Sequence, residues 1–351
     1  MRRTRGAYRE RIADLNPRAL LARLNIDPYV AAIAGTAGLA SLVPVQGMAV
    51  AAAGHATQAA IALMFFLHGA KLEPRAALAG ARHWRLHAVV LLATFVLFPL
   101  LGLTARAVAP HLLPPALWAG LLLLCVLPST VQASIAFTSI ARGNVPAAVC
   151  AATASNLLGM ALTPLLAGLL LHTHGGFSAS AVGDIAVQLL LPFLAGQAAR
   201  PWIGKWVDRN GRLLGLVDRG SVLLVVYVAF SDGVTQGIWH QLDATNLATL
   251  LLVDAALLTA VLWLTTMGSR ALGFSRGDEI VVVFCGSKKS LASGLPMATV
   301  LLAGQSVGLI VLPLMLFHQI QLMACAVLAK RYAARVEAFD RALPRLAEPS
   351  R

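Results

Sequence analysis

Long apolar windows with very few charged residues recur along the whole chain of 351 residues. A membrane-spanning helix needs roughly 20 mostly apolar residues, because the hydrocarbon core of a bilayer is about 30 Å thick. Hydrophobic residues make up 58% of this sequence and charged residues only 12%, whereas a soluble domain is about half apolar and a quarter charged. The pattern predicts an all-α protein that crosses a membrane many times.

Polar or Gly/Pro-rich breaks separate these windows from one another. The candidate spans lie near 28–45, 54–71, 86–108, 115–140, 146–172, 181–199, 218–236, 246–268, 278–302 and 306–329. We therefore predict ten transmembrane helices in a single transporter domain of residues 28–331. A basic leader of residues 1–27 precedes it, and a tail of residues 332–351 follows.

The basic residues orient these spans. If the N-terminus is cytoplasmic, 25 of the 28 Lys and Arg residues fall in the leader, the inner loops or the tail. Adding or removing a span would move every later loop to the other side and destroy this agreement. The positive-inside rule thus predicts ten spans with both termini in the cytoplasm. This topology and anionic lipid headgroups also account for the net charge of +13, so nucleic acid is not an expected partner.

Ten spans divide into two groups of five, and five is odd, so the second group enters the membrane in the opposite sense. Two groups of five spans with opposite orientation are typical of an inverted-topology repeat. In such proteins, interrupted helices at matching positions of the two halves indicate the binding site. Window four contains the string "LLCVLPSTVQASIAFTSIARGN", and window nine contains "VVFCGSKKSLASGLPM". These windows occupy equivalent positions in the two halves, so we predict that spans four and nine are discontinuous.

Two adjacent lysines, Lys288 and Lys289, stand inside window nine. If this span enters the hydrocarbon near Ile280, Lys288 lies roughly 12 Å deep, near the middle of the bilayer. A lysine at that depth costs about 3 kcal/mol and calls for a partner or a water-filled pocket. We predict that at least one of the two lysines lines the site. The alternative is that the span boundaries lie elsewhere and both side chains reach the headgroups.

Other polar residues inside the windows are further candidates for the binding site, and two of them have two possible roles. Asp254 could neutralise a lysine or carry protons, or it could make a local polar contact between helices. His318 could carry protons or form a helix–helix hydrogen bond. Asn156 is informative because an amide has no internal partner in its own helix, whereas Ser and Thr often bond back to the backbone. The four cysteines lack metal-binding or disulfide spacing, so we expect no metal centre.

Several strings of the sequence resemble those of a known family. They are "IDPYVAAIAG", "FFLHGAKL", "ARGN", "NLLGMALTPLL", "FCGSKKSLASGLPMA" and "LPLMLFHQIQL", in order from residue 27 to about 331. The chain resembles the bile acid:sodium symporter superfamily, in particular the branch of vertebrate solute carrier family 10 member 7 and its bacterial relatives. The resemblance implies two inverted five-helix repeats whose helices four and nine are discontinuous and cross near the midplane. A core of spans 3–5 and 8–10 would move against a panel of spans 1, 2, 6 and 7.

The resemblance also implies positions for sodium ligands. Thr94, Asn144, Thr153 and either Ala133 or Ser134 fall near them. Where the family has a glutamate followed four residues later by a glutamine, this chain has Phe284 and Lys288. Losing the carboxylate removes the strongest ligand for a hard cation, and an ammonium repels sodium. Our hypothesis is that Lys288 supplies the positive charge that sodium supplies elsewhere, which makes transport sodium-independent or proton-coupled.

We therefore predict a secondary active transporter of small organic anions or amphipathic acids that works by alternating access and is not an enzyme. Sodium is a possible coupling ion, and no other cofactor is expected. A bias toward Ala, Arg and Leu favours a bacterial inner membrane. A non-transporting sensor on the same fold and, less well supported, an intramembrane enzyme are the alternatives. The candidate substrate- and ion-binding residues are Thr94, Gln132, Ser134, Asn144, Thr153, Asn156, Ser287, Lys288, Lys289, Ser290 and His318, with Asp254 as a possible charge partner.

Overall fold

The computed structural model describes residues 28–71, 83–171, 179–235, 237, 242–302 and 305–346. The predicted leader, residues 1–27, lies outside the described residues, as does the end of the predicted tail. Throughout the described part of the chain the regular structure is helical. This agrees with the all-α prediction, because only helices and closed barrels satisfy their own backbone groups in lipid.

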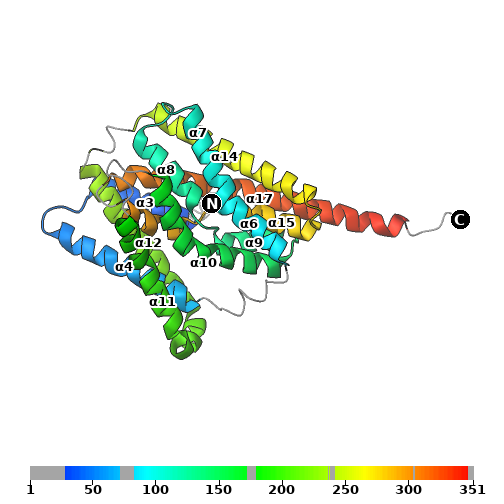
Figure 1. Cartoon of the computed structure of the whole chain (residues 1–351), viewed down its shortest axis with the longest axis horizontal. Helices are drawn as coiled ribbons and strands as arrows, with labels where there is room; N and C mark the ends of the chain where they lie inside the picture. The colour runs from blue at the N-terminus through cyan, green and yellow to red at the C-terminus, as the bar shows by residue number, and fades with distance from the viewer. Residues whose placement is uncertain are drawn as a thin grey trace, which may run out of the picture.

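The helices follow the predicted windows closely (Figure 1). In chain order they are α3 (Pro28–Leu42), α4 (Ala49–Lys71), α6 (Trp84–Leu92), the π-helical turn η2 (Ala93–Leu97), α7 (Phe98–Val108), α8 (Pro115–Val126), α9 (Val131–Ile140), α10 (Val145–Leu170), α11 (Ala179–Arg209), α12 (Gly211–Thr235), α14 (Ala244–Ala271), α15 (Arg276–Gly286), α16 (Leu291–Leu301) and α17 (Val307–Leu346). The last helix continues well beyond residue 331, so it includes much of the segment predicted as a tail.

Length and apolar composition identify six of the described helices as able to cross a membrane, or seven if the bent pair α8 and α9 counts as one span. The six are Ala49–Lys71, Trp84–Val108, Val145–Leu170, Gly211–Thr235, Ala244–Ala271 and Val307–Arg335. This establishes a multi-pass helical membrane architecture. Ten crossings and the inverted repeat stay predictions.

Both predicted interruptions are present. α8 ends at Val126, α9 begins at Val131, and their axes differ by 63°. Pro128 accounts for this break, because proline donates no backbone hydrogen bond and disfavours helical geometry at the residue before it. Accordingly Leu127 is extended, with φ −70° and ψ 152°. The second interruption separates α15, which ends at Gly286, from α16, which begins at Leu291.

The helices pack in two groups around these breaks. α4 packs along α11, and α12 packs against both α3 and α4. These four helices occupy the left and lower part of Figure 1, while α6 to α10 and α14 to α17 form the rest of the bundle. The predicted division into a panel and a core, and the predicted motion between the two, stay predictions.

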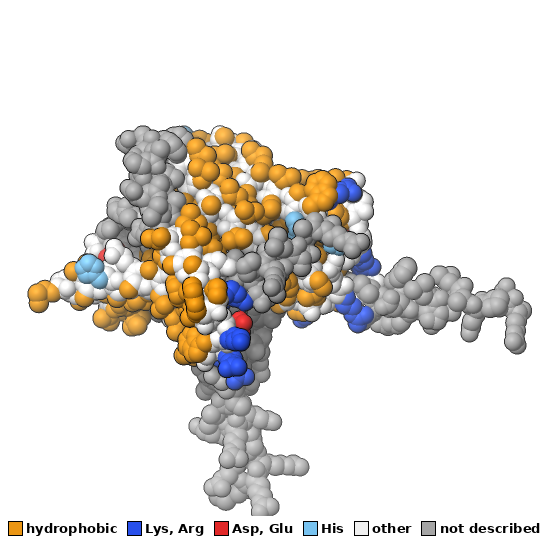
Figure 2. Space-filling view, turned by 60° about the horizontal axis from the view of Figure 1, so that its bottom comes forward, with side chains coloured by type: hydrophobic (Ala, Val, Ile, Leu, Met, Phe, Trp, Pro, Cys, Tyr) orange, Lys and Arg blue, Asp and Glu red, His pale blue; other side chains and the backbone are white. Residues whose placement is uncertain are grey.

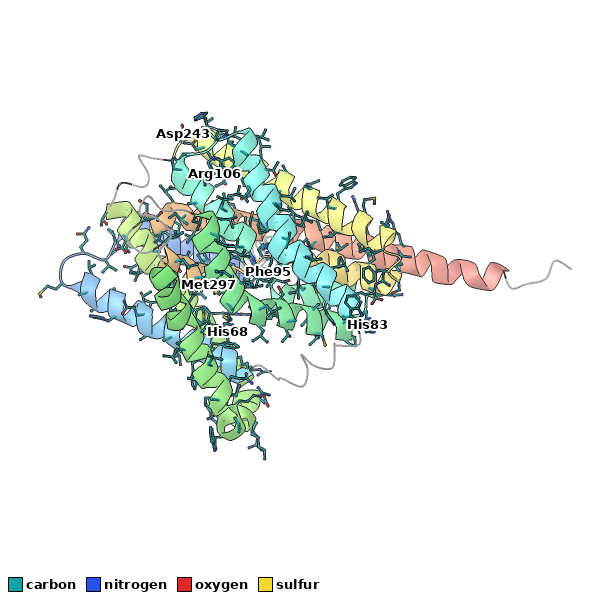
Figure 3. All side chains as sticks on the ribbon, viewed as in Figure 1. His68, His83, Phe95, Arg106, Asp243 and Met297 are labelled. Atoms are coloured by element: carbon teal, nitrogen blue, oxygen red, sulfur yellow. The ribbon has the colours of Figure 1, made fainter. Side chains whose placement is uncertain are left out.

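In the view of Figure 3, Arg106 and Asp243 are at the top and His83 is toward the lower right. The predicted topology places the first two next to outer loops and the third in an inner loop. The orientation of these parts in a membrane stays a prediction. Figure 2 shows hydrophobic side chains covering much of one face, with Lys and Arg gathered toward its lower and right-hand margin. An apolar surface bordered by basic residues suits contact with lipid.

The α4–α11 contact depends on two glycines. A Cβ added at Gly69 would overlap the carbonyl of Phe193, and one added at Gly196 would overlap the carbonyl of Phe66. The two backbones therefore approach each other closely in both directions, as small residues allow in membrane helices.

We expect Gly196→Ala to lower the free energy of unfolding by about 2 kcal/mol, because the added methyl group forces two packed backbones apart. Thermal unfolding of the purified protein in detergent measures this effect. Gly54→Ala in α4 is the matched control, since nothing lies within 4 Å of its added Cβ. The close approach would be unimportant if both variants melted at the wild-type temperature.

Candidate functional site

Five consecutive main-chain carbonyls at the first break have hydrogen-bond donors, and four of the five accept from other segments of the chain. The last carbonyls of a helix have no intrahelical donor, and no water is present in hydrocarbon to replace one. The Leu127 N–H donates to the Leu124 carbonyl, and the Thr163 hydroxyl donates to the Val126 carbonyl. The Ser290 N–H donates to the Pro128 carbonyl. The Lys289 ammonium donates to the carbonyls of Cys125 and Leu127. The two breaks are thus bonded directly to each other.

Lys289 is the centre of this arrangement. Its Nζ lies 2.8 Å from the Thr94 oxygen, 2.7 Å from the Cys125 oxygen and 2.8 Å from the Leu127 oxygen. The side chain is fully buried, and Nζ lies 4.1 Å from the centre of the Phe98 ring. An ammonium has three donors and no acceptor, so three carbonyls satisfy it completely.

The Thr94 carbonyl is free for a local reason. In the π-helical turn η2, the Phe98 N–H donates to the Ala93 oxygen, five residues back. The next donor in that pattern would come from position 99, which is Pro99 and has no N–H. The carbonyl of Thr94 therefore points to a partner outside its own helix, and π-helical turns of this kind often mark functional positions.

Gln321 of α17 holds the backbone of Lys289 in place. The Lys289 N–H donates to Gln321 Oε1 at 3.0 Å, and Gln321 Nε2 donates to the Lys289 carbonyl at 2.9 Å. The Thr130 hydroxyl donates to the same carbonyl at 2.7 Å. Gln321 also lies 2.8 Å from Nδ1 of His318. One amide side chain thus replaces the hydrogen bonds that the unwound residue has lost.

Lys288 has quite different surroundings. Its Nζ lies 4.3 Å from the ring centre of Phe137 and 5.6 Å from that of Phe284. The residue is fully buried, and its ammonium has no hydrogen-bond partner among the described residues. Contact with two aromatic faces is a cation–π arrangement, which is most favourable when the cation is desolvated.

Two neighbouring cavities lie beside the two breaks, with volumes of about 370 Å³ and 670 Å³. Both are lined by Lys71, Thr130, Gln132, Asp218 and Ala292. These residues come from the end of α4, the start of α9, the N-terminal third of α12 and the start of α16. The cavities therefore lie between the two groups of helices, against the N-terminal ends of both half-helices.

The structure brings five of the predicted binding residues to these cavities. Gln132 lines both, Thr153, Asn156 and Ser290 line the smaller one, and His318 lines the larger one. Ala133, the alternative to Ser134, also lines the larger cavity. A binding role for each stays a prediction, now with a defined location.

The remaining predicted residues lie away from the cavity walls. The Thr94 hydroxyl donates to the Val90 carbonyl in its own helix, and the Ser134 hydroxyl contacts Ser129 and the Phe284 carbonyl. Asn144 caps α10 and donates to Asp278. Neither lysine is among the residues lining the two cavities. Roles in ion binding for these residues, and for buried Ser287, stay predictions.

Asp254 is buried in α14, and both carboxylate oxygens have no hydrogen-bond partner among the described residues. No ion pair in this part of the chain joins it to Lys288 or Lys289. Its role as a charge partner therefore stays a prediction.

The sequence-based candidates did not include Lys71, His68 and Asp218. His68 Nε2 lies 3.8 Å from Asp218 Oδ1, and all three residues line the smaller cavity. Lys71 and Asp218 stand near span ends, where ordinary topology already explains a charge. Gln321 is one of the polar residues of window ten, but it was not assigned a binding role, although an amide buried in a membrane helix was a signal that could have indicated one.

Comparison with known proteins identifies the family. The sequence model of the SBF-like CPA transporter family matches residues 27–334. The chain belongs to this family. It is 51% identical over 313 residues to the "Putative symporter YfeH" of Escherichia coli, covering 89% of this chain and 94% of that protein. It is 55% identical over 328 residues to an uncharacterized protein of Pseudomonas aeruginosa, covering 93% and 98% of the two chains.

A more distant relative comes from a vertebrate. The "Sodium/bile acid cotransporter 7-B" of Xenopus laevis is 27% identical over 279 residues, which cover 78% of this chain and 80% of that protein. These matches confirm the predicted membership of the bile acid:sodium symporter superfamily. The chain is therefore a multi-pass membrane transporter, with the lipid bilayer as its surroundings and a small molecule as its substrate.

We expect Gln321→Leu to lower the free energy of unfolding by about 2–4 kcal/mol, because it leaves the N–H of Lys289 without a partner and removes a donor from its carbonyl. Gln319→Leu is the matched control on the same helix, since the amide atoms of Gln319 have no hydrogen-bond partner among the described residues. Thermal unfolding in detergent separates the two variants. Equal melting temperatures would show that the amide does not hold the break.

Proposed function

We propose that this member of the family is a secondary active transporter of small organic anions or amphipathic acids. We place it in a bacterial inner membrane, with both termini in the cytoplasm, and we assign substrate binding to the two cavities beside the two breaks. The observation that carries the proposal is the uncapped N-terminus of α9, which faces both cavities.

The start of α9 is suited to an anion. Thr130 stands at the N-cap position, but its hydroxyl donates to the Lys289 carbonyl, and no side chain caps the helix. The first N–H groups of a helix have no intrahelical acceptor and carry a partial positive charge. Thr130, Val131 and Gln132 line the smaller cavity. A carboxylate bound there would supply the missing acceptor.

The second half-helix, α16, also begins at this place. Ser290 at the N-cap of α16 accepts a bond from the Ser293 N–H, and both residues line the smaller cavity. Half-helix N-termini that meet near the bilayer centre are the usual anion-binding elements of transporters with broken helices.

Charged side chains alone do not select an anion. Lys71 and Arg219 line the larger cavity together with Asp208 and Asp218, so basic and acidic groups are balanced. Selection for a negative charge therefore falls on the helix ends.

The cavity walls also contain apolar groups. Leu157 and Phe193 line the smaller cavity, and Tyr29, Phe137 and Leu291 line the larger one. A pocket with apolar walls and few polar groups suits a substrate with a hydrophobic body and one acidic group. The name of the Xenopus laevis relative refers to a bile acid, which is a molecule of this kind.

The position of the cavities supports alternating access. They lie between α4, α11 and α12 on one side and α9, α10, α16 and α17 on the other. Movement of one group against the other would open the site to either side of the membrane in turn. Sodium and protons are the two coupling ions that we propose for this cycle.

A negative charge placed at the start of α9 should oppose binding of an anion. We expect Gln132→Glu to raise the KM for organic-anion uptake about ten-fold, because the new carboxylate repels the substrate at close range. Gln132→Met, which removes the amide without adding charge, should have a smaller effect. Uptake of a labelled bile acid and of smaller carboxylates into proteoliposomes measures this. A similar KM for both variants would contradict binding of an anion at this helix end.

Secondary active transport couples uptake of the substrate to an ion gradient. We expect proteoliposomes to accumulate the labelled acid above the external concentration when a sodium or proton gradient is imposed, and only to equilibrate when an ionophore collapses it. Imposing each gradient separately identifies the coupling ion. Equilibration alone under both gradients would contradict secondary active transport.

A further inference from the structure

The three carbonyls around Lys289 form a site for a cation. The oxygens of Thr94, Cys125 and Leu127 lie 2.7–2.8 Å from one ammonium nitrogen. All three are main-chain oxygens, and the aromatic face of Phe98 adds a further attraction for positive charge. Main-chain carbonyls that converge in this way are the ligands that channels and transporters use for alkali cations.

The backbone builds this cage independently of the lysine. The Thr94 carbonyl is free because of the π-helical turn and Pro99. The Cys125 carbonyl stands at the end of α8, and that of Leu127 precedes Pro128 in the break. If the ammonium were removed, three buried acceptors would lose their donor, which is costly away from water.

We propose that Lys289 is the tethered occupant of a monovalent-cation site. Its ammonium fills the carbonyl cage in the native chain, and the same cage binds a free cation once the side chain is shortened. A consequence, which rests on the proposed function, is that a coupling ion does not bind and leave at this position during transport.

Lys288 offers a matched comparison one residue away. Its ammonium is as deeply buried but faces the rings of Phe137 and Phe284 and has no hydrogen-bond partner among the described residues. Shortening Lys288 therefore removes a charge without exposing a set of carbonyl acceptors. The two adjacent lysines distinguish a cation cage from a buried charge in general.

The test compares Lys289→Ala, Lys288→Ala and the wild type as purified full-length proteins in detergent. Thermal unfolding is measured in sodium chloride, in propylammonium chloride and in N-methylglucamine chloride at equal ionic strength. Propylammonium replaces the three methylene groups and the ammonium that Lys289→Ala lacks. 1-Propanol, which lacks the charge, controls for filling of the space.

We expect sodium and propylammonium to raise the melting temperature of Lys289→Ala by roughly 3 °C, the shift that a ten-fold stabilisation produces in a protein of this order of size. N-Methylglucamine and propanol should have no such effect. Propylammonium should not raise the melting temperature of the wild type or of Lys288→Ala. Any rise that sodium causes in these two proteins should be smaller than the rise in Lys289→Ala. This readout does not use uptake, so failure of the cage and failure of the transport proposal are distinguishable.

A second variant guards against a folding defect. Lys289→Met fills the space with an apolar chain, and we expect the added cations to stabilise it no more than they stabilise the wild type. An equal response of Lys289→Met or Lys288→Ala to sodium would overturn the proposal, because binding would then lie elsewhere. If Lys289→Ala is recovered only when propylammonium is present during solubilisation, the proposal is supported. Failure to recover it with any of the cations would contradict it.

Discussion

In the hydrocarbon of a membrane, no water is available to donate a hydrogen bond to an unpaired carbonyl. The structure around the two breaks follows from this constraint. Helix α8 ends inside the bundle, where its last carbonyls would otherwise be orphaned. The ammonium of Lys289 bonds to two carbonyls at this end and to a third in the neighbouring span. Gln321 then satisfies the backbone of Lys289 itself. One lysine and one amide therefore connect four of the predicted spans at a single point.

The same contacts shape the cavities. The hydroxyl of Thr130 donates to the carbonyl of Lys289, and no side chain caps the helix that follows it. The first turn of α9 keeps unpaired N–H groups, and these face the cavities. The hydrogen bonds that join the two breaks thus lie beside the helix end to which we assign the anion. In this proposal, structural support and substrate recognition share one small region of the protein.

Adjacent lysines play different parts here. The sequence predicted a buried cation in span nine, and the family resemblance placed Lys288 where related proteins have a glutamine. In the structure Lys289 meets the carbonyls, while Lys288 is enclosed by aromatic rings. The unwound backbone of residues 287–290 sends the two side chains in different directions. No helical periodicity applies within such a segment, so side-chain direction could not be derived from spacing.

The sequence by itself determined the helical class, the place of both breaks and membership of the family. Each of these depends on local features: apolar length, Pro128, and a cluster of Gly and Ser residues around the lysines. Only the tertiary structure decided which lysine bonds to the backbone, because its acceptors lie 162 to 195 residues away along the chain. Only the tertiary structure also shows that Lys71 and Asp218 line the cavities. Topology already explains a charged residue near the end of a span, so the sequence offered no reason to expect these two at a site. Contacts between distant segments arise from packing, and no pattern within one window encodes them.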